Sequence, residues 1–226
     1  MKILKFGGTS VGKPENLKII YEILEKEIFK ETEPAAVFSA LSGVTNQLID
    51  ISRLAAKKDL TYRNILEQLR RRHIQFVEAL FPQSEQKNIT TEIDALINEL
   101  QEIVHGIYLL KELSDRSKDL IMSFGERLST KIIAAYGKTY GLSTQYVDAR
   151  EIIVTDDNFG SARILPKITI SKIQDYFQNT PGLKIITGFI AATEEGITTT
   201  LGRGGSDFTA AVIGSALNAE EVQIWT

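Results

Sequence analysis

The chain has 226 residues, of which 43% are hydrophobic and 24% are charged, as is ordinary for a soluble globular protein. Its net charge of −3 gives no electrostatic reason to expect nucleic acid or an anionic membrane as a partner. The absence of cysteine excludes disulfides and thiolate catalysis, and two histidines, His73 and His105, argue against a histidine metal cluster. No apolar run reaches the roughly 18 residues of a membrane span. We therefore expect a cytoplasmic protein with no nucleic-acid or membrane partner.

The first predicted element is a short apolar strand over residues 1–6, and a glycine-rich turn follows it. Residues 7–13 match the spacing of a Walker A phosphate-binding loop, but Pro14 stands where that motif needs a magnesium-binding hydroxyl. Proline is well suited to the first position of a helix. We therefore interpret the Walker match as coincidental. Lys5, just before the glycines, is the better candidate than Lys13 for a phosphate-binding lysine.

A helix is predicted after Pro14, a buried strand over residues 35–39, and helical periodicity from about residue 46 to Gly141. The long helical block has three apolar stripes: Ile65, Leu69, Phe76 and Leu80; Ile89, Ile93, Ile97, Leu100, Val104 and Ile107; and Leu120, Phe124, Leu128, Ile132 and Tyr136. Pro82 separates the first two stripes, and Gly141 suits a helix C-cap.

Strand patterns return near residues 145–147, 184–190, 196–200 and 222–225. A second glycine-rich turn, residues 202–205, precedes an apolar helix predicted over residues 208–217. Ser206 and Asp207 are strong N-cap residue types, so we expect them to cap this helix and present an anion-attracting N-terminus. Strands alternating with helices predict an α/β fold whose mostly parallel sheet is covered on both faces.

Several short blocks along the chain resemble signature segments of aspartate kinases, within the wider amino acid kinase family. They are KFGGTSV at residues 5–11, FSALSGVTN at 38–46, SFGERLS at 123–129, TGFI at 187–190, TLGRGGSD at 200–207 and IWT at 224–226. The blocks occur in the family's order and span nearly the whole chain. The resemblance implies a three-layer α/β/α sandwich, with acceptor and nucleotide sites near the carboxyl ends of the strands.

The same resemblance implies that residues 1–226 form an amino acid kinase catalytic domain. They would contain the acceptor-binding lobe and the beginning of the nucleotide-binding lobe, without regulatory ACT domains. The chain stops at Thr226, in a predicted strand, so we expect a fragment truncated at its C-terminal part; a naturally short relative is the alternative. Both a monofunctional parent and one fused to homoserine dehydrogenase stay open.

For aspartate kinases, the reaction transfers a phosphoryl group from Mg-ATP to the side-chain carboxylate of L-aspartate. The product is aspartyl phosphate, the first intermediate toward lysine, threonine and methionine. The resemblance thus implies ATP with nucleotide-bound Mg²⁺, L-aspartate as the partner molecule, no metal site of the protein itself, and a possible homodimer. No general base is needed, because an aspartate side chain is ionised at neutral pH.

An amino-acid acceptor requires a cation for its α-carboxylate and an anion for its α-ammonium. Arg203 is the candidate for the first role, because a guanidinium binds carboxylates through two hydrogen bonds. Glu126 is the candidate for the second; it follows Gly125 inside a helical pattern, where glycine indicates either close packing or close approach of backbone. The resemblance adds hydroxyls of Ser39, Thr45 and Ser206 to the aspartate site.

Phosphate binding is assigned to Lys5, assisted by backbone N–H groups of Gly7 and Gly8. Asp207 is expected to orient Lys5 or the acceptor, and both are predicted as catalytic residues. Thr226 is placed with the nucleotide site by the resemblance.

Each assignment has a plainer alternative. Lys5 could be a solvated lysine, Asp207 only a helix cap, and Glu126 a surface partner of a Lys or Arg one turn away. The hydroxyls of Ser39 and Thr45 could bond local backbone. Residues 158–163 are interpreted as a turn first and as acceptor-site lining second. Two other functions also stay open: an amino acid kinase with a different acceptor, and an aspartate-binding or dimerising module without turnover.

Overall fold

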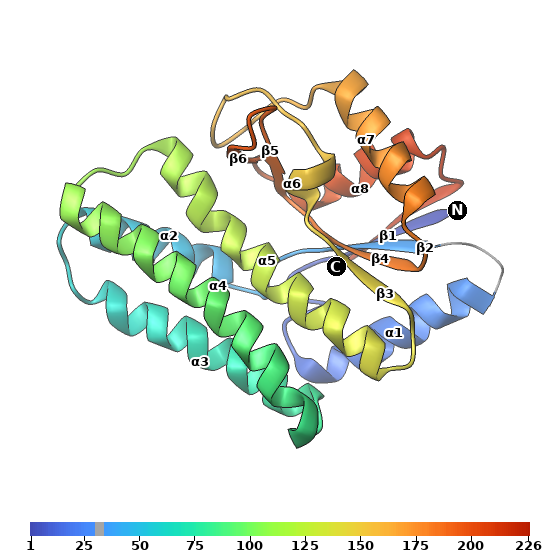
Figure 1. The fold of residues 1–226 in the computed structure, drawn as a ribbon, viewed down its shortest axis with the longest axis horizontal. Helices are drawn as coiled ribbons and strands as arrows, with labels where there is room; N and C mark the ends of the chain where they lie inside the picture. Colours follow the sequence, from blue (N-terminus) through green and yellow to red (C-terminus); the bar gives the residue numbers. More distant parts are fainter. Residues whose placement is uncertain (30–33) are drawn as a thin grey trace.

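The computed structural model describes residues 1–29 and 34–226, and a parallel sheet forms its centre (Figure 1). Within the described residues the sheet has five strands in the order β3-β4-β2-β1-β7, and every pairing is parallel. Their bounds are β1 (Lys2–Phe6), β2 (Pro34–Phe38), β3 (Thr144–Val147), β4 (Leu183–Thr187) and β7 (Glu221–Trp225). A small antiparallel pair, β5 (Ile190–Ala192) and β6 (Thr198–Thr200), lies beside it. The mostly parallel sheet is confirmed.

The sheet separates two apolar layers, because alternate residues of a strand point to opposite faces. In β1, Leu4 and Phe6 join one core cluster, whereas Ile3 joins the other. Helices α1 (Pro14–Phe29) and α5 (Asp115–Thr139) cover the first face. Helices α6 (Ala149–Ile152), α7 (Pro166–Asn179) and α8 (Gly205–Ala216) cover the second. This arrangement is the expected three-layer α/β/α sandwich.

The long helical block folds as a bundle that extends from the first face of the sheet (Figure 1). Helices α2 (Val44–Ala56), α3 (Tyr62–Leu80) and α4 (Gln83–Leu110) pack together and against α5. Their apolar stripes enter one continuous core. His73 is buried in this core, where its Nδ1 lies 2.8 Å from the Leu69 carbonyl oxygen, so it has a packing role.

Two local predictions were wrong, and backbone geometry explains both. Helix α8 begins at Gly205 rather than at residue 208, and its N-cap is Gly204, with a φ of 75° that favours glycine. Ser206 and Asp207 therefore lie in the first turn and do not cap the helix. The strand expected over residues 184–190 is interrupted after Thr187, where Phe189 has a φ of 66°.

No helix in the described part of the chain is both long and apolar enough to cross a bilayer.

Candidate active site

A cavity of about 350 Å³ opens at the carboxyl ends of β1 and β2, between α5 and the N-terminus of α8. Eight of the ten predicted site residues line it: Lys5, Gly8, Ser39, Thr45, Glu126, Arg203, Ser206 and Asp207. The two others, Gly7 and Thr226, are not among its lining residues. Segments that are far apart in sequence thus meet at the edge where a parallel sheet commonly binds ligands.

Lys5 contributes its side-chain amine to the cavity wall, and this side chain is buried rather than solvated. Its side chain is 8% exposed, and its Nζ lies 2.6 Å from Asp207 Oδ1 in the first turn of α8. A lysine this buried requires an anionic partner. The prediction that Asp207 orients Lys5 agrees with this contact.

The glycines after β1 permit close approach of backbone, but the Gly7 amide is already used. Its N–H donates to the Trp225 carbonyl oxygen at 2.9 Å, so the expected contact of this group with phosphate is wrong for this arrangement. At Gly8, a Cβ would lie 2.8 Å from the Ala40 carbonyl oxygen. Only glycine fits there without moving the backbone. Thr226 follows β7 beside Gly7, outside the cavity lining.

Glu126 provides a buried carboxylate in the cavity wall. Its side chain is 3% exposed, and Oε1 accepts a 3.1 Å hydrogen bond from the Ala40 N–H. Oε2 is buried and has no hydrogen-bond partner among the described residues. Burial raises the pKa of Glu126 to about 8, against the lowering effect of the Ala40 hydrogen bond. The alternative of a surface ion pair is therefore wrong, and Oε2 is left to accept from a ligand.

The segment that leads from Ser39 after β2 to Thr45 in the first turn of α2 is held by two other helices. A Cβ on Gly125 would lie 2.9 Å from the Ala40 Cβ, which confirms the expected close packing. Ser129 Oγ donates to the Ser39 carbonyl oxygen at 3.0 Å, and Arg72 of α3 donates to the Ser42 carbonyl oxygen at 2.8 Å. The sequence interpretation missed Ser129, although it stands one helical turn after Glu126 in the same sequence block.

The opposite wall is the glycine turn that presents Arg203. Gly202 and Gly204 flank this residue with φ values of 74° and 75°, which only glycine adopts readily. Ser206 follows and is buried; a Cβ on Gly188 would lie 2.6 Å from its Oγ. The cavity therefore offers a guanidinium and a carboxylate within one enclosure. This pairing suits a small zwitterion.

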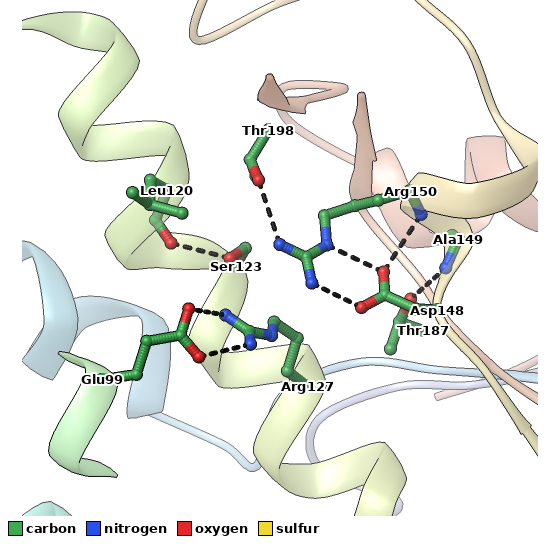
Figure 2. Close-up of polar contacts among 9 residues, drawn as sticks. All are labelled: Glu99, Leu120, Ser123, Arg127, Asp148, Ala149, Arg150, Thr187 and Thr198. Atoms are coloured by element: carbon green, nitrogen blue, oxygen red, sulfur yellow. Dashed lines mark hydrogen bonds and ion pairs between the residues drawn. The ribbon is translucent and has the colours of Figure 1, made fainter. Parts of the chain in front are cut away.

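Two other arginines form ion pairs with carboxylate side chains of the protein (Figure 2). Arg127 is next to Glu126 in sequence but forms two bonds with Glu99 of α4, at 3.2 and 2.8 Å. Arg150 forms two bonds with the Asp148 side chain, at 2.9 and 2.7 Å, and donates to Thr198 Oγ1 at 3.1 Å. Both guanidinium groups are paired with carboxylates of the protein, and neither residue lines the cavity, so Arg203 remains the candidate.

Two remaining questions are whether residues 158–163 contribute to the site and whether it could hold a metal ion. Residues 158–163 do not line the cavity, so their interpretation as acceptor-site lining is not supported. Within the ranges that the structure describes, no group of three or more His, Cys, Asp or Glu side chains could hold a metal ion.

The comparisons with known proteins agree with this geometry. The family model described as the amino acid kinase family matches residues 1–226. The chain belongs to the amino acid kinase family. The family expected from the sequence blocks is thereby confirmed.

Within this family, similar proteins carry the name aspartokinase. Aspartokinase 1, chloroplastic, from Arabidopsis thaliana is 36% identical over 99% of this chain and 39% of that protein. The aspartokinase of Chlamydia trachomatis is 33% identical over 99% of this chain and 48% of that protein. A bifunctional aspartokinase/homoserine dehydrogenase from Zea mays is 30% identical, with 24% of its length covered. The chain thus spans half or less of these relatives.

Solved structures give the same result. Escherichia coli aspartokinase III in complex with aspartate and ADP superposes with a TM-score of 0.89 at 30% identity, over 100% of this chain and 49% of that one. The fold expected from the resemblance is therefore that of a known amino acid kinase.

Proposed function

We propose that this chain is the acceptor-binding lobe, with the beginning of the nucleotide-binding lobe, of an aspartate kinase. The observation that carries the proposal is the cavity that combines the buried carboxylate of Glu126 with the guanidinium of Arg203. The similarity to a structure of aspartokinase III that holds aspartate and ADP supports it.

The proposed acceptor is L-aspartate, bound through its α-carbon groups. Arg203 binds the α-carboxylate through two hydrogen bonds, and Glu126 Oε2 accepts from the α-ammonium. Hydroxyls of Ser39, Thr45 and Ser206 contribute further hydrogen bonds. The side-chain carboxylate is left free to react.

In the proposed reaction, a side-chain carboxylate oxygen attacks the γ-phosphorus of ATP. The bond from the γ-phosphorus to the bridging oxygen breaks, the electron pair leaves with ADP, and aspartyl phosphate forms without proton transfer. Lys5 neutralises charge that develops on the transferring group, and Asp207 holds the Lys5 amine in place.

The residues present fit a phosphate group at this edge. Lys5 is a buried amine, and a Cβ on Gly7 would lie 3.3 Å from its Nζ. The two glycines after β1 place no side chain beside this amine, so a polyphosphate can approach both the amine and the Gly8 backbone. Magnesium, when bound with ATP, neutralises charge on the β- and γ-phosphate oxygens. Thr226 stays assigned to the nucleotide site as part of this proposal.

One alternative is binding without turnover. The chain covers 39% to 49% of three aspartokinases to which it is similar. An amino acid kinase with a different carboxylate or phosphate acceptor is the other alternative, but Glu126 together with Arg203 calls for a free amino acid.

Calorimetric titration with L-aspartate tests the proposal, with D-aspartate, L-glutamate and Mg-ATP as comparison ligands. We expect selective binding of L-aspartate, and ADP release only if this chain completes the nucleotide site. A folded sample that binds none of the amino acids would contradict the acceptor assignment, provided that a longer chain extended beyond Thr226 also fails to bind.

The compartment and assembly stay proposals as well. We infer a cytoplasmic protein, although several of the relatives are chloroplastic, and a homodimer is the assembly expected from the family.

A further inference from the structure

Asp119 is a fully buried carboxylate on α5 that lies outside the cavity lining. Its Oδ2 accepts from the Gly160 N–H at 2.8 Å and from the Thr200 N–H at 2.9 Å. Its Oδ1 accepts from Thr200 Oγ1 at 2.8 Å. Three hydrogen bonds to one carboxylate form a strong connection, because each is assisted by the charge. Asp119 thereby joins three segments: α5, the loop of residues 158–163, and the end of β6.

The end of β6 leads directly into the turn that presents Arg203. Thr200 stands three residues before Arg203, and its carbonyl oxygen accepts from the Ala162 N–H at 2.9 Å. Its amide and hydroxyl are both bonded to Asp119, so all of its polar groups are used. One residue before Arg203, a Cβ on Gly202 would lie 3.1 Å from Ser161 Oγ. The start of the turn is therefore fixed by Asp119 and by the 158–163 loop.

The same helix holds the other half of the cavity. Asp119 and Glu126 are seven residues apart on α5, which is about two turns or roughly 10.5 Å along one side of a helix. Glu126 reaches the cavity itself, whereas Asp119 reaches the segment that carries Arg203. One rigid element thus sets the positions of both charged groups.

We infer that Asp119 is a positioning residue that fixes the distance between Arg203 and Glu126, with the 158–163 loop as its second support. This inference rests on the proposed function, since it assumes that both groups hold one amino-acid ligand. It gives a role to residues 158–163, which the cavity itself does not use. Because Asp119 is fully buried and does not line the cavity, it contacts no ligand.

The test compares two substitutions of Asp119. Asp119→Ala leaves the N–H groups of Gly160 and Thr200 without their acceptor, and we expect L-aspartate binding to weaken about tenfold or more. Asp119→Asn can keep all three bonds: its amide oxygen accepts from both N–H groups, and its NH₂ donates to the Thr200 hydroxyl, which can also accept. We expect this variant to restore most of the affinity.

Ser123→Ala is the matched control. Ser123 is buried on the same helix, one turn further on, and its hydroxyl donates at 2.7 Å to the Leu120 carbonyl oxygen of α5 itself. Its removal deletes a buried hydrogen bond without affecting the connection to Thr200. We expect unchanged affinity for L-aspartate, measured by calorimetry, in a sample whose circular dichroism matches the unaltered chain.

Four outcomes decide the inference. A folded Asp119→Ala chain that binds L-aspartate as the unaltered chain does would overturn it, as would a loss in Asp119→Asn equal to that in Asp119→Ala. If Asp119→Ala does not fold, Thr200→Val decides instead, since it removes only the hydroxyl bond; unchanged affinity there would also overturn the inference. Failure of both the unaltered chain and a longer chain extended beyond Thr226 to bind any amino acid would refute the proposed function first, and this inference with it.

Discussion

The two charged walls of the cavity are held in place by different forces. Glu126 lies in the middle of the 25-residue helix α5, between the buried apolar residues Phe124 and Leu128. Arg203 lies in a turn between two glycines with positive φ. Packing fixes the first group, and a few hydrogen bonds fix the second. The helical wall should therefore tolerate loss of one polar contact, whereas the turn should not.

Lys5 lies in neither of these walls. Its substitution should have a larger effect than substitution of either wall residue. In a complete enzyme, Lys5→Ala should lower the turnover number by a factor on the order of 100 to 1000, because it removes charge stabilisation made in the transition state. The Michaelis constant for aspartate should change much less. Steady-state kinetics at saturating Mg-ATP measure both, and retained turnover would exclude Lys5 from transition-state stabilisation.

Arg203→Ala tests the turn. The loss of a charge-assisted pair should weaken L-aspartate binding by roughly 2–3 kcal/mol, while the free energy of unfolding changes by less than about 0.5 kcal/mol. Arg163→Ala, which removes an exposed charge from the neighbouring loop, is the control. Calorimetry and urea denaturation measure the two quantities. An unchanged aspartate affinity would remove Arg203 from the acceptor site.

Glu126 makes binding depend on pH. Burial raises its pKa to about 8, and a bound ammonium favours the ionised form, so binding below pH 8 must release a proton. The affinity for L-aspartate should therefore rise by up to about tenfold per pH unit toward pH 8 and then level off. Calorimetry in two buffers of different ionisation enthalpy measures the released proton. A flat affinity between pH 6 and 8, with no proton released, would contradict this role.

The same group should limit the stability of the free protein. Its pKa in the folded state exceeds the ordinary value of 4.5, so its contribution is fully present below about pH 4.5 and is lost as the pH rises to about 8. A glutamine at this position does not ionise, so Glu126→Gln does not lose stability in this pH range. Relative to the unaltered chain, the variant should gain stability between pH 5 and 9, on the order of a few kcal/mol. Melting temperatures of both proteins across this pH range test the prediction. Parallel pH profiles of melting temperature would refute it.

Much of this arrangement could be predicted because its signals are local. Periodicity revealed the helices, and short blocks of glycine and charged residues identified eight cavity residues. The misses have non-local causes. The Gly7 amide is used by Trp225 at the other end of the chain. Asp119 resembles a solvated residue in a helical pattern, and its hydrogen bonds come from Gly160 and Thr200, which are 41 and 81 positions away.

The Lys5–Asp207 contact has a consequence for anion selection. Because the two groups lie 2.6 Å apart, the amine already has a partner before any anion arrives. An arriving anion therefore meets a charge that Asp207 already partly offsets, although the three N–H donors of the amine can hold Asp207 and a phosphate oxygen together. A single charge such as chloride gains little from the remaining field, whereas a group that carries several charges gains at each of its oxygens. We therefore expect the pair to favour polyphosphates over small anions of single charge.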